Sequence, residues 1–237
     1  MIKNALQYIV GLRKPEIIEV GGETYCDKPL EHVSFNPKAS SLTLTTLTSL
    51  VDYITSGIDE MSEKMLVHVV SPTEVCLYSN LDEERKREEL IRVKADIPSF
   101  PFDKYLESEK FIIGVQSKFL PTDDSKLILK FAGTVEDGTV AQYSDDGVTQ
   151  KAVIKQGPVS KADAIVPNPV TLQPYRTFVE VDQPETEFVF RMQSEDGTVY
   201  CALFEADGGS WRNEAMKNIK EYLQEHLRDY PQFTVIS

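Results

Sequence analysis

The segment Pro167–Leu227 decides the fold: it reads PNPVTLQPYRTFVEVDQP, then ETEFVFRMQSEDGTVYCALFEADGGSW, then RNEAMKNIKEYLQEHL. Alternating apolar residues in the first two parts predict two strands, a tight turn at Asp196-Gly197 and a third strand. Gly208-Gly209 interrupts this pattern and precedes an amphipathic helix. The apolar face of that helix is predicted to comprise Trp211, Ala215, Ile219, Tyr222, Leu223 and Leu227.

Turn and cap residues place the elements upstream of this segment. Gly21-Gly22 lies between PEIIEV and ETYC and predicts a β-hairpin, because paired glycines supply the positive φ of a two-residue turn. Thr45 and Gly57 bracket an amphipathic helix as its cap and its stop. The other predicted elements are a helix over 2–12, strands over 66–70, 74–79 and 88–96, helices after Ser108 and Thr122, and turns at Asp137-Gly138 and Asp146-Gly147.

Short hairpin connections outnumber helical crossovers in this pattern, which favours an α+β fold over a doubly wound α/β fold. We expect a mainly antiparallel sheet with hairpins, several packed helices and a long C-terminal amphipathic helix that closes the sheet. The 237 residues suit one domain over 1–237. A subdivision into a mixed hairpin and helix part, 1–133, and a sheet part with the C-terminal helix, 134–237, remains open.

The charge balance narrows the class of partner. The chain has 38 acidic against 25 basic residues and a formal charge of -13. This excess opposes direct binding to nucleic acid or to anionic lipid, since both are polyanions. It permits binding to basic protein surfaces, and it favours an acidic, soluble protein.

Cysteine usage and hydropathy indicate an intracellular protein without a membrane segment. The three cysteines are widely spaced and form no CxxC motif, so we expect buried free thiols in a reducing cytosol. The sequence has no run of about 18 apolar residues, the length that a membrane-spanning helix needs. The N-terminus lacks the apolar core and cleavage site of a signal peptide.

Four acidic residues form one candidate metal site. Glu180 and Asp182, like Glu205 and Asp207, are two residues apart, so each pair would point to one face of a strand. If the two strands were neighbours, the four carboxylates could hold Mg²⁺, which prefers oxygen ligands. The competing interpretation is that Glu205 and Asp207 flank the start of the last helix, where acids are favoured. Ser210 is expected to cap that helix.

A second candidate site is cationic and aromatic. Tyr175 and Arg176 are adjacent, and Arg191 from the strand FVFRMQ could join them. Such residues bind a nucleotide by ion pairing and stacking. The competing interpretation is an ion pair between arginine and a nearby carboxylate, such as Glu180 or Glu187. No catalytic residue is predicted, because no histidine lies in a recognisable nucleophile motif.

Several blocks along the chain resemble one family. LTTLTSLVDYI, FIIGVQSKF, SDDGVTQKAVIKQG, PNPVTLQPYRTFVEVDQP, FVFRMQ and ALFEADGGSW are similar to blocks of the YfdQ-like proteins of phages and prophages, from about residue 42 to 228. That family is uncharacterised. The resemblance implies a bacteriophage or prophage protein of the host cytoplasm, and it supplies no catalytic residues.

The leading functional hypothesis is a phage-encoded, non-catalytic binding or accessory protein. It would serve host take-over, counter-defence or phage DNA metabolism by contacting a host or phage protein, and it would form a homo-oligomer. One alternative is a counter-defence protein that sequesters a nucleotide signal through Tyr175, Arg176 and Arg191. Another is a Mg²⁺-dependent phosphodiesterase or nuclease that uses the four carboxylates. No cofactor is expected outside this last alternative.

Overall fold

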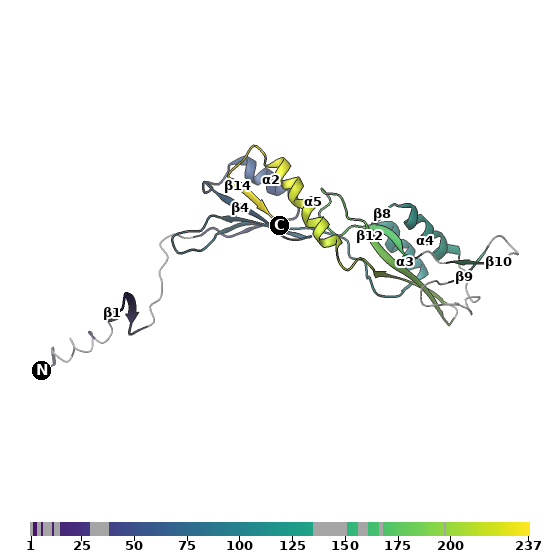
Figure 1. Ribbon diagram of the computed structural model, residues 1–237, viewed down its shortest axis with the longest axis horizontal. Coiled ribbons are helices and arrows are strands. Elements are labelled where there is room, and N and C mark those ends of the chain that lie inside the picture. Colours follow the sequence, from purple (N-terminus) through teal and green to yellow (C-terminus); the bar gives the residue numbers. More distant parts are fainter. Residues whose placement is uncertain are drawn as a thin grey trace. The chain divides into compact units, whose positions relative to one another are not determined.

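The computed structural model describes residues 2, 3, 6, 11, 15–28, 38–134, 151–155, 161–165, 168–196 and 198–237 (Figure 1). The chain divides into two compact units, Met1–Lys38 and Ala39–Ser237. The helix predicted over 2–12 and the turns at Asp137-Gly138 and Asp146-Gly147 lie outside the described residues, apart from isolated positions at the N-terminus.

The first unit contains an isolated β-hairpin. Strands β1 (Ile17–Val20) and β2 (Glu23–Cys26) pair antiparallel, and Gly21 and Gly22 between them have φ values of 64° and 87°. The predicted hairpin is therefore confirmed, because only glycine adopts these φ values without strain. Every residue of the two strands is exposed.

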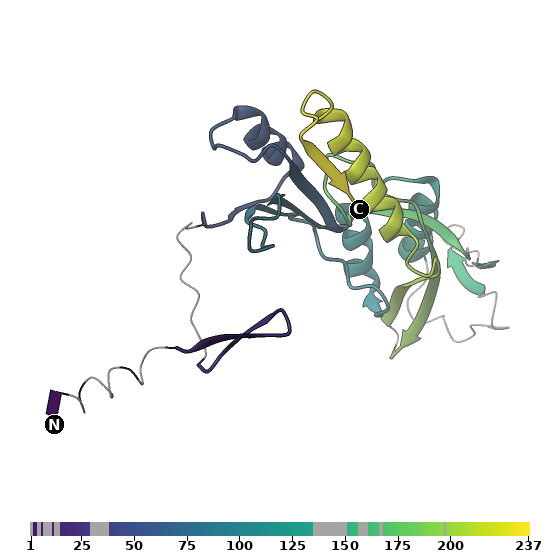
Figure 2. The same ribbon diagram turned by 60° about the vertical axis from the view of Figure 1, so that its left-hand side comes forward.

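The second unit contains two five-stranded sheets, each with its own hydrophobic core (Figure 2). The first sheet has the order β14-β4-β5-β6-β3. Its three central strands are antiparallel, whereas each edge strand runs parallel to its neighbour. The bounds are β3 (Leu42–Leu44), β4 (Met65–Ser71), β5 (Glu74–Ser79), β6 (Glu89–Lys94) and β14 (Phe233–Ile236).

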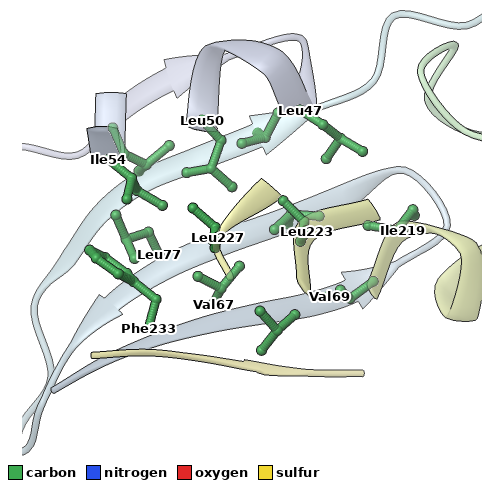
Figure 3. Packing of buried hydrophobic residues seen from close by; sticks show 14 of the residues in the cluster. Leu47, Leu50, Ile54, Val67, Val69, Leu77, Ile219, Leu223, Leu227 and Phe233 are labelled. Atoms are coloured by element: carbon green, nitrogen blue, oxygen red, sulfur yellow. The ribbon is translucent and has the colours of Figure 1, made fainter. Parts of the chain in front are cut away.

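Helices α2 (Leu47–Ser56) and α5 (Trp211–His226) cover one face of this first sheet (Figure 3). Thr46 caps α2 by accepting a hydrogen bond from the Ser49 amide at 3.2 Å, and Gly57 ends it with φ 60°. The cap thus lies one residue after the predicted Thr45. The side chains labelled in Figure 3 come from both helices, from Leu227 directly after α5, and from strands β4, β5 and β14: Leu47, Leu50, Ile54, Val67, Val69, Leu77, Ile219, Leu223, Leu227 and Phe233.

The second sheet is antiparallel throughout and has the order β7-β13-β12-β11-β8. Glu195 of β12 lies opposite Thr198 of β13, which confirms the hairpin predicted at Asp196-Gly197. Helices α3 and α4 contribute to its aromatic core. The bounds are β7 (Leu106–Glu107), α3 (Ser108–Lys118), β8 (Phe119–Leu120), α4 (Asp123–Thr134), β11 (Val170–Pro174), β12 (Thr186–Glu195) and β13 (Thr198–Glu205); β9 (Lys151–Lys155) and β10 (Lys161–Ile165) form a separate antiparallel pair.

Helices together with antiparallel-rich sheets confirm the α+β class. The expected position of the C-terminal helix is wrong, however. The apolar residues Ile219, Leu223 and Leu227 of α5 belong to the core of the first sheet, not to that of the preceding strands β11–β13. The chain crosses from one sheet to the other after β13, and neighbouring segments of sequence therefore pack in different cores. None of the described helices is long and apolar enough to span a bilayer.

The cysteines are free, but only two of them are buried as expected: Cys76 and Cys201 are buried, whereas Cys26 is exposed. Burial raises the pKa of the Cys201 thiol to about 12, and burial is also the main reason why the pKa of Cys76 is raised. Both thiols are therefore protonated and shielded at neutral pH.

We predict that the folded protein reacts rapidly with a thiol reagent at one site only, and at three sites once unfolded in denaturant. The reason is that reactivity requires an accessible thiolate. Release of thionitrobenzoate from Ellman's reagent measures both numbers. Cys26→Ser should abolish the rapid phase. A rapid phase that persists in this variant would contradict the assignment.

Candidate functional site

The segment 175–185, between β11 and β12, joins the two cores of the second unit. It is not a strand, although its sequence predicts one. Phe178 and Val181 are buried in the core of the first sheet, while the flanking strands belong to the second sheet. The hydroxyl of Thr177 donates to the Pro72 carbonyl beyond the end of β4, which ties the segment to the first sheet.

The buried side chain of Gln183 stabilises this segment by hydrogen bonds to its main chain. Its side-chain oxygen accepts the amides of Arg176 at 2.9 Å and Thr177 at 3.2 Å. Its side-chain nitrogen donates to the carbonyls of Phe178 at 2.9 Å and Val181 at 3.3 Å. Gln183 is only 5% exposed, so one amide group satisfies four main-chain groups that water does not reach.

Arg176 lies at the junction with its guanidinium packed against three aromatic rings. The Cζ atom is 4.2 Å from the Phe102 ring centre, 4.7 Å from that of Trp211 and 5.0 Å from that of Phe188. These rings come from three parts of the chain: the loop before β7, the first turn of α5, and β12. Because a cation is attracted to the face of each ring, one side chain connects elements of both sheets.

The guanidinium of Arg176 is buried, with 7% of the residue exposed. Its Nη1 lies 3.1 Å from Oε1 of Glu205, an ion pair by distance, but none of its nitrogens has a hydrogen-bond acceptor of good geometry among the described residues. Burial lowers the pKa of Arg176 to about 10, against the opposing attraction of Glu205 and Asp207. The ring faces and the nearby carboxylates therefore replace the hydration of a charged group.

Trp211 is the ring shared by two arginines. Arg212 packs over its indole at 4.9 Å, in addition to Arg176. A Cβ at Gly209 would clash with the end of the Arg212 side chain, but that flexible side chain could move aside, so the backbone conformation is the stronger reason for glycine. Gly208 and Gly209 have φ values of 65° and 82°, which side chains rarely adopt.

Asp207, rather than the predicted Ser210, caps α5. Its carboxylate accepts the amides of Gly209 at 2.9 Å and Trp211 at 3.1 Å and the hydroxyl of Ser210 at 3.2 Å. Burial acts to raise the pKa of Asp207, but these hydrogen bonds outweigh it and the pKa is lowered. The amides at the start of α5 are thus bound by the Asp207 carboxylate from the same turn, and this carboxylate also attracts the Arg176 cation.

The other candidate ligand-binding residues do not gather around Arg176. Tyr175 is half-buried, and its amide donates to the Lys118 carbonyl beside β8. Arg191 alternates along β12 with Phe190 and Met192, which face the core of the second sheet. Arg191 therefore lies on the opposite face of that sheet from Phe188 and Arg176.

The four candidate carboxylates do not form one group either, because the two pairs make different contacts. Glu205 and Asp207 lie beside Arg176. Glu180 accepts the amide of Thr48 in the first turn of α2 at 3.3 Å, and the carbonyl of exposed Asp182 accepts from the Asn218 side chain of α5 at 3.0 Å. Within the described part of the chain, no three histidine, cysteine or acidic side chains are grouped as metal ligands would be.

Sequence reasoning missed Gln183 and Phe102 as parts of this site. Phe102 is more than seventy positions from Arg176, and the amide of Asp103 donates to the Leu203 carbonyl at 2.9 Å, which fixes Phe102 beside β13. No local pattern signals that contact. Gln183 stands seven residues after Arg176 before a proline, among several other polar residues, so no local pattern distinguishes it.

Comparison of the chain with family models, with curated proteins and with solved structures found no match in any of the three.

Replacing Gln183 should destabilise the second unit. Gln183→Leu keeps the volume but leaves up to three buried main-chain groups without partners, because the Phe178 carbonyl also accepts the Val181 amide at 3.4 Å; each group left unsatisfied costs about 1–3 kcal/mol. We expect the free energy of unfolding to fall by about 3 kcal/mol or more in urea denaturation. Gln116→Leu on the exposed side of α3 is the matched control, with a change within about 0.5 kcal/mol. Equal effects of the two changes would refute the role of Gln183.

Arg176 and Glu205 should behave as a coupled pair. Arg176→Met leaves the Glu205 carboxylate without its counter-charge, and Glu205→Gln leaves the buried cation without its own. Each single change should cost about 2 kcal/mol or more, whereas the double change removes both charges and should cost less than the sum. A double-mutant cycle by urea denaturation measures the coupling. Strict additivity would show that the two charges do not interact.

Proposed function

We propose that this chain is a phage-encoded accessory protein that acts in the host cytoplasm by binding another protein. The phage setting is supported by the resemblance to YfdQ-like proteins over residues 42–228. The binding role is supported by one structural observation, the exposed apolar face of the β1–β2 hairpin. The two parts of the proposal therefore rest on separate grounds.

The hairpin has two different faces. Register places Ile18 opposite Tyr25 and Val20 opposite Glu23, so these four side chains share one face. Ile18, Val20 and Tyr25 are 53%, 60% and 51% exposed. A two-stranded hairpin has no core of its own and is marginally stable in water, and an exposed apolar patch marks a contact surface. A partner that covers Ile18, Val20 and Tyr25 would stabilise the hairpin.

The charge of the hairpin indicates the kind of partner. Within residues 15–28, the four acids Glu16, Glu19, Glu23 and Asp27 outnumber the one cation, Lys28; Glu23 lies on the apolar face and Glu19 on the opposite face. The complementary surface is an apolar groove rimmed by lysine or arginine, since opposite potentials speed and orient association. A host or phage protein with such a groove is the partner class that fits.

Each of the two alternative functions requires a set of residues to lie close together, and in both cases the residues lie apart. A nucleotide-sequestering site needs Arg176 and Arg191 to reach one ligand, yet they lie on opposite faces of the second sheet. A carboxylate metal site needs Glu180 and Asp182 near Glu205 and Asp207, yet the first pair contacts α2 and α5 while the second flanks Arg176. We therefore favour the binding role.

The apolar face of the hairpin should be required for partner capture. Ile18→Asp places a charge on that face, whereas Thr24→Asp on the adjacent strand places the same charge on the opposite face. Tagged full-length protein expressed in the host should enrich one specific protein with the wild type and with Thr24→Asp. Ile18→Asp should reduce the enrichment at least about tenfold, because burying an isoleucine contributes about 1.5–3 kcal/mol.

Quantitative mass spectrometry of the captured proteins provides the measurement, and circular dichroism checks that both variants remain folded. Enrichment that is equal in the two variants, or that is no greater than with an untagged control, would overturn the proposal.

A further inference from the structure

Strand β14 presents an unpaired edge at one side of the first sheet. Among the described strands it is the outermost one of its sheet and pairs with β4 only, in parallel (Figure 3). The Met65 amide donates to the Gln232 carbonyl at 2.8 Å, and Thr234 lies opposite Leu66. In a parallel pair, alternate residues of a strand bind the neighbour, so Gln232, Thr234 and Ile236 direct their main-chain groups toward β4.

The intervening residues direct their main-chain groups outward. The Phe233 amide donates to the Tyr230 carbonyl at 3.1 Å, which satisfies one of them. The remaining groups at the outer edge are the amides of Val235 and Ser237 and the carbonyls of Phe233, Val235 and Ser237. Apart from the Ser237 carbonyl, these donors and acceptors are placed symmetrically about Val235.

This symmetry matches a second copy of the same strand in antiparallel orientation. With Val235 opposite Val235 of the other copy, each Val235 amide reaches the other copy's Val235 carbonyl. Each Ser237 amide reaches the other copy's Phe233 carbonyl. The outward amides and the carbonyls of Phe233 and Val235 are then paired, in the two-fold arrangement of an isologous interface.

The other edge strands of the two five-stranded sheets are less suited to such pairing. Strand β3 has three residues, and the acidic side chains of Glu88 and Glu89 bind the chain just before it at Ala39 and Ser41. The edge strands β7 and β8 of the second sheet have two residues each. Strand β14, with the sequence FTVI, has four residues and contains neither proline nor charge, the usual protections of an exposed edge.

The surface beside this edge carries little charge. A hollow of about 310 Å³ between the end of α5 and β14 is lined by Gln224, Leu227, Arg228, Tyr230, Pro231, Phe233, Thr234 and Val235. Arg228 is its one charged lining residue, in a chain with a net charge of -13. Two copies can therefore approach here with less repulsion than the overall charge implies.

We propose that two copies of this chain associate through antiparallel pairing of β14 about a two-fold axis, with Val235 opposite Val235. The pairing joins the two first sheets into one continuous sheet. Val235 and Phe233 remain in their own cores, while Thr234 of each copy lies opposite Ile236 of the other on the opposite sheet face. Ile236, 40% exposed in the single chain, becomes covered.

The register gives a direct test by disulfide trapping. Thr234 and Ile236 of the other copy form a non-hydrogen-bonded pair with a Cα separation of about 4.5 Å, within the range that a disulfide bridges. Full-length Thr234→Cys and Ile236→Cys proteins are prepared in a Cys26→Ser background, because Cys26 is exposed. An equimolar mixture is oxidised mildly and resolved on a non-reducing gel.

The mixture should form cross-linked dimer at least about tenfold faster than either variant alone, since pairing raises the effective concentration of the two thiols. Thr43→Cys, on the exposed edge strand β3, is the matched control. When Thr43→Cys replaces Thr234→Cys in the mixture, cross-linked dimer should form no faster than with either variant alone. Light scattering should give twice the chain mass for the wild type and a single-chain mass for Ile236→Lys.

A wild type that stays at the single-chain mass as its concentration rises would overturn the proposal. A dimer that forms without faster cross-linking in the mixture would do the same, because it would assign association to another surface. Ile18→Asp does not alter β14, so failure of partner capture and failure of this pairing are distinguishable.

Discussion

A buried arginine between three aromatic rings is the interaction on which the second unit depends. Only 7% of Arg176 is exposed, and its pKa is lowered to about 10 because burial disfavours the charged form. Removing a charged group from water is costly unless other groups compensate. The faces of Phe102, Phe188 and Trp211 and the carboxylate of Glu205 provide that compensation, and they are contributed by elements of both sheets.

This constraint explains the irregular segment that follows β11. To place Arg176 among the rings and Phe178 in the other core, the chain must leave the second sheet and return to it. Main-chain groups on such a path have no strand partner, and Gln183 binds four of them from within. The same constraint fixes the start of α5, where Trp211 contacts Arg176 and the Asp207 cap and the two glycines set the direction of the helix.

Two surfaces that take no part in the contacts of Arg176 suit association with other molecules. The β1–β2 hairpin exposes apolar side chains on one face, and β14 exposes main-chain hydrogen-bonding groups at an edge. The first surface is apolar in a segment with more acids than bases and suits a basic partner, whereas the second carries little charge and suits a second copy. The candidate ligand residues, by contrast, are mostly engaged in contacts within the chain.

The sequence by itself determined the local elements of this protein. Glycine pairs and Asp-Gly steps set the hairpins at Gly21 and Asp196, and periodic apolar residues set the buried face of α5, because turns and amphipathic faces depend on residues close in sequence. Only the tertiary structure decided that α5 covers the first sheet, that Arg191 faces away from Arg176 and that Phe102 packs on it. These contacts join residues far apart in sequence, and local periodicity carries no information about which of two cores a segment enters.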